Sequence, residues 1–368
     1  MSSLTSLIFG QKILLAEYIT IRFGLSIVVS FFSMLFIMPR GIKWLKKIQV
    51  SGQPIRDKSD YKAEYANDVV IIDHSAKKGT PTMGGIFMIF STIVSCLLFA
   101  NLSEPKVFLT LSVMILFGGI GFCDDYAKLS KKSMSGIKGK KKFALQMIIC
   151  MLVVYFAHFI DLVNTNLYFP LFKSLVINLG CLYFIFSAIV ITGSSNAVNL
   201  TDGLDGLVSM PIFLTAFTLA IVAYLAGNSI YSNYLHLPSV KQAGELSVIC
   251  GAMMGSCLGF LWFNSKPACI FMGDTGSLSF GATLGIIAVF IKQEFILFIA
   301  GGIFVIEAMS VILQVVSYRL RNKKRIFLMA PIHHHFEKKG LKEEKVVIRF
   351  WIISFLFTIL ALALIKLR

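Results

Sequence analysis

The feature that most constrains this chain of 368 residues is a run of about 20 apolar residues that recurs about ten times. A helix of that length crosses roughly 30 Å of membrane hydrocarbon at 1.5 Å per residue, and it satisfies its own backbone hydrogen bonds where lipid offers none. The sequence therefore predicts an all-α polytopic integral membrane protein. About ten transmembrane helices are expected, over 18–38, 82–100, 107–123, 143–160, 174–193, 207–226, 246–263, 277–292, 295–316 and 347–365.

The composition excludes the other common classes. With 56% hydrophobic and 15% charged residues, the chain is too apolar for a soluble globule. The runs are also far longer than the alternating strands of an outer-membrane barrel. Met1–Glu17 has no cleavage site after a short apolar core, so we expect the first span to be retained. The seven cysteines include no C-x-x-C pair, which predicts neither a zinc site nor a disulfide framework.

The distribution of basic residues predicts the topology. A net charge of +16 suggests nucleic acid at first, but lysine and arginine also collect in the cytoplasmic loops of membrane proteins. The loops after the odd-numbered spans hold 26 of the 35 basic residues, and the opposite side holds 7. We therefore expect no nucleic-acid partner and both termini on the periplasmic side. The cytoplasmic loops are 39–81, 124–142, 194–206, 264–276 and 317–346, within a single domain over 1–368.

An acid pair marks the most informative stretch, Gly121–Leu129, which reads GFCDDYAKL. Asp124 and Asp125 follow an uncharged apolar run and precede a loop with seven lysines, of which Lys128 is the first. Acids at a membrane edge are costly, and at a helix C-terminus they also oppose the macrodipole. They could bind a hard cation such as Mg²⁺, which prefers oxygen ligands, or take up a proton. The alternative is a solvated helix end.

Two further segments carry polar side chains on the same side. Lys77–Gly85 reads KKGTPTMGG, and its ammonium groups, the hydroxyl of Thr82 and the paired glycines suit a phosphate. The alternative is an ordinary basic loop. Gly193–Gly206 reads GSSNAVNLTDGLDG, with polar side chains at every third position that would share one face of a helix: Asn196, Asn199, Asp202 and Asp205. The alternative, favoured by the glycines, is a polar turn.

The last two cytoplasmic loops complete the set. Trp262–Ser277 presents Asp274 as a third carboxylate, with Asn264 for hydrogen bonding and Phe271 for base stacking, although a plain turn would use the same residues. Ala330–Lys338 reads APIHHHFEK, whose histidines suit anion recognition or proton transfer better than zinc. Glu307 and Gln314 in the ninth span are lesser candidates.

Five motifs, taken in chain order, resemble those of the bacterial phospho-N-acetylmuramoyl-pentapeptide transferases. They are KGTPTMGG, DDYAK, NAVNLTDGLDG, FMGDTGS and PIHHHFE. These enzymes belong to the polyprenyl-phosphate N-acetylhexosamine-1-phosphate transferase superfamily, and the resemblance covers essentially the whole chain. It implies a bacterial inner-membrane enzyme of peptidoglycan synthesis whose active site faces the cytoplasm. The implied substrates are UDP-N-acetylmuramoyl-pentapeptide and undecaprenyl phosphate, the products are lipid I and UMP, the cofactor is Mg²⁺, and the implied assembly is a homodimer.

Guided by the resemblance, we assign roles to the motif residues. Asp274, with Asp125, is expected to hold Mg²⁺, and Asp124 to deprotonate or orient the lipid phosphate. His333 is a further catalytic candidate, and with His334 and His335 it would grip the donor. The remaining substrate-binding candidates are Lys77, Thr82, Lys128, Asn196, Asn199, Asp202, Asp205, Asn264, Phe271 and Gln314.

Three alternatives stay open at this point. Attack can be direct or pass through a phospho-aspartate. A sister transferase for UDP-N-acetylglucosamine is disfavoured by the HHH loop and KGTPTMGG. A cation-coupled transporter would place its acids at mid-bilayer between broken helices, whereas nearly all the acids here fall in cytoplasmic loops.

Overall fold

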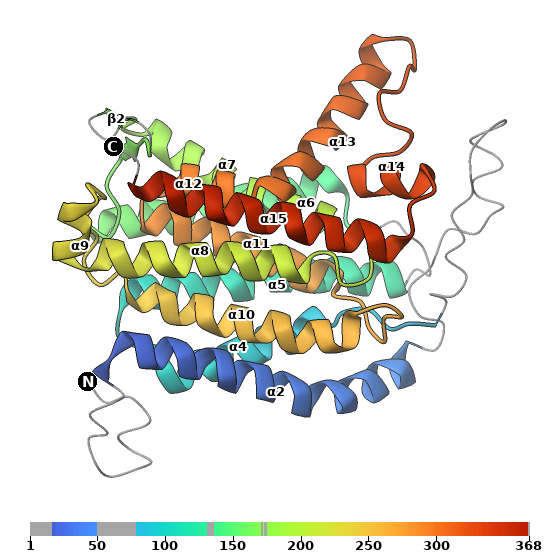
Figure 1. The fold of residues 1–368 in the computed structure, drawn as a ribbon, viewed down its shortest axis with the longest axis horizontal. Coiled ribbons are helices and arrows are strands. Elements are labelled where there is room, and N and C mark those ends of the chain that lie inside the picture. The colour runs from blue at the N-terminus through green and yellow to red at the C-terminus, as the bar shows by residue number, and fades with distance from the viewer. Residues whose placement is uncertain (1–16, 50–78, 131–135, 171, 173–174, 367–368) are drawn as a thin grey trace.

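The computed structural model describes residues 17–49, 79–130, 136–170, 172 and 175–366. The predicted site residue Lys77 lies outside these ranges. The described chain forms an elongated helical bundle (Figure 1). Its main helices are α2 (Ile19–Ile48), α4 (Gly85–Phe99), α5 (Pro105–Ser130), α6 (Gly139–Phe159), α7 (Leu182–Thr201), α8 (Ser209–Gly227), α10 (Glu245–Asn264), α11 (Gly273–Phe290), α13 (Gly302–Leu320) and α15 (Glu343–Lys366).

The prediction of a polytopic helical membrane protein agrees with these elements. Within the described residues, nine helices are long and apolar enough to cross a membrane, and α4 is a shorter apolar helix of 15 residues. Three short helices connect the others: α9 (Ser229–Tyr234), α12 (Glu294–Ala300) and α14 (Ile332–Lys338). Figure 1 shows that α2 begins and α15 ends at one end of the bundle, which we call the far end. The end where α11 begins is the acid-pair end.

The all-α prediction is wrong at one small hairpin, and one predicted span is broken. Strands β1 (Asn166–Tyr168) and β2 (Val176–Asn178) pair antiparallel at the far end, so the predicted helix over 174–193 begins only at Leu182. The β-branched residues of β2 favour a strand, and Gly180 takes a positive φ of 50° before the helix. The predicted span 295–316 divides at Gly301 into α12 and α13, and α13 leaves the bundle at an angle (Figure 1).

Three helices extend well beyond their predicted spans at the acid-pair end, and the first of them, α2, runs to Ile48 rather than to residue 38. Helix α5 runs to Ser130, so Asp124 and Asp125 lie inside a helix rather than at the start of a loop. An ion pair of 2.8 Å between Lys128 Nζ and Asp124 Oδ2 at i,i+4 stabilises these last turns. Helix α7 runs to Thr201, so Asn196 and Asn199 of the predicted loop 194–206 lie in the helix.

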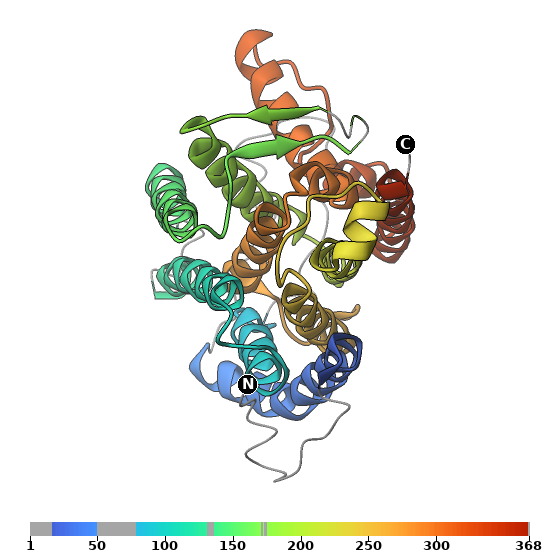
Figure 2. The ribbon, with the colours of Figure 1, turned by 90° about the vertical axis from the view of Figure 1, so that its left-hand side faces the viewer.

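Helix α11 forms the centre of the bundle, as the view along the helices shows (Figure 2). All its residues from Thr275 to Phe290 are buried, and it packs against both α5 and α7. Small residues permit this close packing between helices. At Gly121 of α5, a Cβ atom would overlap the carbonyl oxygen of Asp274. The missing side chain therefore allows the α11 N-terminus to lie directly against the turn of α5 that carries the acid pair.

This close approach can be tested with Gly121→Ala. We expect the added methyl to force α5 and α11 apart and to cost about 1–3 kcal/mol, as overpacking does. Gly119→Ala is the matched control, because a Cβ there meets no atom within 4 Å. Thermal unfolding in detergent should show a clear fall in Tm for Gly121→Ala and an unchanged or slightly higher Tm for Gly119→Ala. Equal melting temperatures for both variants would contradict the packing described here.

Candidate functional site

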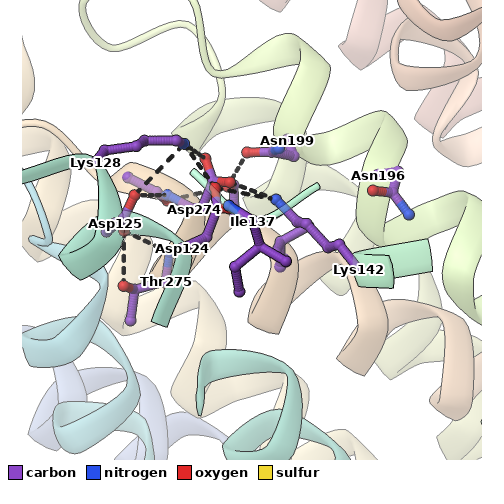
Figure 3. A network of polar contacts seen from close by, with 12 residues as sticks. Asp124, Asp125, Lys128, Ile137, Lys142, Asn196, Asn199, Asp274 and Thr275 are labelled. Carbon is purple, nitrogen blue, oxygen red and sulfur yellow. Dashed lines mark hydrogen bonds and ion pairs between the residues drawn. The ribbon is translucent and has the colours of Figure 1, made fainter. Parts of the chain in front are cut away.

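The N-terminus of α11 is held by the side chain of Asp125 (Figure 3). Asp125 Oδ1 accepts a hydrogen bond from the amide of Asp274 at 3.2 Å, and Oδ2 accepts from the amide and the hydroxyl of Thr275 at 3.0 and 2.8 Å. The first amides of a helix have no partner within the helix, so a carboxylate from another helix can supply the cap. Asp125 is only 2% exposed. It therefore fixes the position of Asp274 relative to α5.

Asp124 and Asp274 face the same two lysines (Figure 3). Lys128 Nζ lies 2.8 Å from Asp124 Oδ2 and 3.2 Å from Asp274 Oδ1. Lys142 Nζ, from the first turn of α6, lies 2.5 Å from Asp274 Oδ2 and 3.5 Å from Asp124 Oδ2. The other oxygen of Asp124 accepts a hydrogen bond of 2.6 Å from the amide of Ile137. The result is a cluster of alternating carboxylates and ammonium groups, which we call the carboxylate–lysine cluster.

The TPTMGG segment lies alongside the segment that precedes α11. Phe271 donates its amide to the carbonyl of Pro81 at 2.9 Å and accepts from the amide of Gly84 at 2.9 Å. This pairing places the buried hydroxyl of Thr82 near Gly273, where a Cβ would meet both Thr82 Oγ1 and Asp125 Oδ2. The buried Thr82 Oγ1 has no hydrogen-bond partner among the described residues. Phe271 itself is half-buried beside the site.

Gln49, at the end of α2, fixes the backbone of Thr82. Its amide oxygen accepts from the Thr82 amide at 3.0 Å, and its nitrogen donates to the Thr82 carbonyl at 3.2 Å. The next residue, Met83, takes a φ of 74°, which is uncommon for a side chain with a Cβ. Backbone strain of this kind persists where surrounding contacts enforce it, often at functional sites.

Helix α7 brings only some of its predicted residues to the cluster. Asn199 accepts a hydrogen bond of 2.7 Å from the hydroxyl of Ser277, in the second turn of α11 (Figure 3). Asn196 instead donates to Gln146 of α6 at 2.8 Å. The triplet spacing of these residues therefore does not produce one continuous polar face.

Asp202, just after α7, joins the cluster through Gly273. It lies close enough to the amide of Gly273 and to the carboxylates of Asp274 and Asp125 for each of them to shift its pKa. Burial, then the negative charges of Asp274 and Asp125, raise the pKa of Asp202 to about 7, and the amide of Gly273 acts in the opposite direction.

Asp205 and Asn264 stabilise the loops rather than point at the cluster. Asp205 Oδ2 accepts from the amide of Ala268 at 3.2 Å, and Asn264 Oδ1 accepts from the amide of Gly206 at 3.0 Å. The Asn264 amide group also donates to the carbonyl of Ile270 at 2.8 Å. Both side chains are buried, and they tie the turn after α7 to the loop before α11.

The histidine motif forms the short helix α14 instead of a loop. His333 is completely buried and hydrogen-bonded to Glu307 of α13 at 3.0 Å. His334 pairs with Glu337 at 2.7 Å, and His335 accepts from the amide of Leu328 at 3.1 Å. Gln314 bonds to the backbone of Ile326 and Phe327, in the loop after α13.

The donor atoms of the cluster suit a hard cation. Carboxylate oxygens are the ligands that Mg²⁺ prefers, and it commonly takes only one or two of them plus phosphate oxygens and water. Among the described residues no group of three or more histidine, cysteine or acidic side chains has a metal-binding arrangement. Asp124 and Asp274 fit such a two-carboxylate site. The oxygens of Asp125 already accept three hydrogen bonds from α11, so the prediction that it binds the metal stays a prediction.

Sequence reasoning did not single out three residues of the site. Lys142 was one of seven lysines in a basic loop, and nothing in the sequence distinguishes it from Lys141. Thr275 and Gln49 carry common polar side chains, and only the folded chain brings them to Asp125 and Thr82. The one available signal was the position of Thr275 directly after Asp274.

The chain is similar to known proteins over most of its length. Residues 107–292 match the model of the family described as glycosyl transferase family 4. Three similar proteins are each named phospho-N-acetylmuramoyl-pentapeptide-transferase. They come from Rickettsia bellii (52% identical), Rickettsia akari (51%) and Rickettsia felis (50%). Each alignment covers 96% of this chain and 95% of the relative.

The raised pKa of Asp202 predicts a pH-dependent stability. The folded protein favours the protonated form, so this contribution to stability is present below the ordinary pKa of 3.8 and is lost as pH rises through about 7. Asp202→Asn mimics the neutral acid at every pH. We therefore expect the Tm of Asp202→Asn, relative to the unsubstituted protein, to be higher at pH 8 than at pH 5. The same Tm difference at both pH values would contradict the assignment.

Proposed function

Because this chain belongs to glycosyl transferase family 4, among its phospho-N-acetylmuramoyl-pentapeptide transferases, we propose that it makes lipid I. It transfers phospho-N-acetylmuramoyl-pentapeptide from the UDP derivative to undecaprenyl phosphate and releases UMP. The observation that carries this proposal is the carboxylate–lysine cluster at one end of a membrane bundle. A lipid phosphate and a soluble nucleotide can meet only where the bilayer ends.

The chemistry is a phosphoryl exchange. An oxygen of the lipid phosphate forms a bond to the phosphorus that carries the sugar, and the bond from that phosphorus to the oxygen of UMP breaks. UMP leaves with the electron pair of that bond. Catalysis then consists of bringing two anions together and stabilising charge on the phosphoryl oxygens and on the leaving group.

The lysines of the cluster suit this task. Lys128 and Lys142 are partly buried and each contacts both Asp124 and Asp274, so their ammonium groups are held in place before substrate binds. Donors that are ordered in advance stabilise developing charge without the cost of reorganisation. The two lysines would turn toward phosphate oxygens, which are stronger acceptors than water. Asp124 would orient the lipid phosphate, and attack would be direct.

Mg²⁺ is the proposed cofactor. Asp274 and Asp124 are the two carboxylates that would hold it, and the bound ion would neutralise the diphosphate of the donor. The capping hydrogen bonds of Asp125 favour a supporting role for that residue, which keeps Asp274 in position for the metal.

The remaining substrate contacts follow from the residues around the cluster. Thr82 and Asn199 lie beside it, and Phe271 supplies an aromatic ring for uracil. Lys77 and Asp202, with His334 and His335 of the histidine motif, complete the proposed donor site. The enzyme would sit in the bacterial inner membrane with this site facing the cytoplasm and both termini in the periplasm. The bias of basic residues supports that orientation.

A cation-coupled transporter is disfavoured by the location of the acids. Transporter sites lie near the bilayer midplane between broken helices. Here Asp124 and Asp125 lie in the last two turns of α5, and Asp274 lies in the first turn of α11. The break between α12 and α13 carries no carboxylate of the cluster.

The central test is UMP release from UDP-N-acetylmuramoyl-pentapeptide, undecaprenyl phosphate and Mg²⁺ by the purified protein. We expect Asp124→Asn and Asp274→Asn to lower the rate at least 100-fold, since each removes a charge from the phosphate-binding cluster. Asp161→Asn is the control, because Asp161 is exposed in a turn between α6 and β1. Folded variants that release UMP at the unsubstituted rate would contradict the proposal.

The role of Lys142 can be tested against that of its neighbour Lys141. Lys142→Gln removes an ammonium group that contacts Asp124 and Asp274, whereas Lys141→Gln removes an exposed one from the adjacent position. We expect the first to lower kcat for UMP release by 10- to 1000-fold and the second to change it less than twofold, because loss of one preorganised donor has an effect of that order. Equal rates for the two variants would exclude Lys142 from the site.

A further inference from the structure

One buried acid has no part in the carboxylate–lysine cluster. Glu307 lies in α13, is completely buried, and accepts two hydrogen bonds from the start of α14. Its Oε2 accepts from the amide of Ile332 at 3.0 Å, and its Oε1 is 3.0 Å from Nδ1 of His333. A buried carboxylate in an apolar helix is costly, so its two partners must offset the loss of water.

The carboxylate determines where His333 carries its proton. An ionised carboxylate can only accept hydrogen bonds, so an ionised Glu307 requires Nδ1 to be the protonated nitrogen of His333. In the neutral ring the other nitrogen, Nε2, then carries a lone pair. Among the described residues Nε2 has no hydrogen-bond partner, although it is buried. It lies against Gly203, where a Cβ atom would overlap it.

Gly203 connects the imidazole to the cluster. The preceding residue, Asp202, lies close to the amide of Gly273, next to Asp274. The downstream half of the same turn is tied elsewhere, through Asp205 and Gly206, to Glu343 and Asn264. Gly203, in the other half of the turn, lies on the ring of His333.

We propose that Glu307 is a positioning residue that acts through His333 on the turn carrying Asp202. By holding Nδ1 protonated, Glu307 sets the ring angle and keeps an unprotonated edge against the Gly203 backbone, which seats Asp202 beside Gly273. In the other tautomer an N–H group would point at the Cα of Gly203 with no acceptor. The expected effect on kcat rests on the proposed function, whereas the expected effect on the His333 tautomer does not.

Glu307→Gln tests whether the carboxylate of Glu307 determines the tautomer of His333. Glutamine keeps the volume but has one acceptor and one donor, so it cannot accept from both Ile332 and His333 Nδ1. We expect His333 to change tautomer, and kcat for UMP release to fall about 10- to 100-fold, since small misplacements of site residues have effects of that size. The tautomer is read from ¹⁵N shifts of histidine-labelled full-length protein, with the His333 signal assigned by its loss in His333→Gln.

Gly203→Ala tests the same contact from the other side. Its Cβ would push His333 and the turn apart while leaving the Glu307 hydrogen bond intact, so kcat should fall and the Nδ1 proton should remain. The double variant Glu307→Gln/Gly203→Ala should lower kcat little more than either single variant, because both substitutions disrupt the same contact between His333 and Gly203. Glu104→Gln is the matched control. Glu104 is also a buried glutamate with a nearby cation, since its carboxylate lies 3.7 Å from Lys106 Nζ. We expect Glu104→Gln to leave the rate of UMP release unchanged.

The outcomes are distinct. An unchanged His333 signal or an unchanged kcat in folded Glu307→Gln overturns the proposal. If Glu307→Gln does not fold, Gly203→Ala decides, and a rate equal to that of the unsubstituted protein overturns the proposal. If the unsubstituted protein releases no UMP, the proposed function fails, and the tautomer comparison alone still decides whether Glu307 sets the proton of His333.

Discussion

The capping of α11 by the Asp125 side chain is the interaction on which the site depends. The first amides of a buried helix need acceptors, and here they are found on a neighbouring helix rather than in water. Because Gly121 lets the two backbones touch, the cap is short and direct. The same contact sets Asp274 beside Asp124, so one structural requirement of the fold also assembles the pair of carboxylates that faces Lys128 and Lys142.

Around this junction, buried polar groups satisfy one another in pairs that connect distant parts of the chain. Gln49 holds Thr82, Ser277 holds Asn199, and Glu307 holds His333. In an apolar bundle an unpaired polar group is costly, so each pair also restricts the geometry of the helices that carry it. The polar residues of the motifs thus divide into those that face the cluster and those that hold the loops around it.

Much of the fold could be predicted because lipid imposes a strict length and composition on every crossing. Each predicted span overlaps a described helix, although α2 and α7 end well beyond their predicted bounds, and both described ends lie at one end of the bundle. The errors fell where that constraint is weak. The hairpin β1–β2 lies between crossings, Gly301 breaks a run that is apolar throughout, and α5 and α7 continue beyond their apolar residues because Lys128 and Ser277 pair with their polar ends.

The sequence by itself determined the class of the protein and the residue types of its site, because apolar run length and charge bias are properties of the chain alone. The carboxylates at 124, 125 and 274 were visible there as costly charges next to apolar runs. Only the tertiary structure decided their separate environments. In the folded chain Lys142 contacts Asp274, Asp125 caps α11, and His333 is buried against Glu307. The sequence shows none of these pairings. Hydrogen bonding and ion pairing act over about 3 Å, and the pairing of residues more than 100 positions apart is set by how the helices pack.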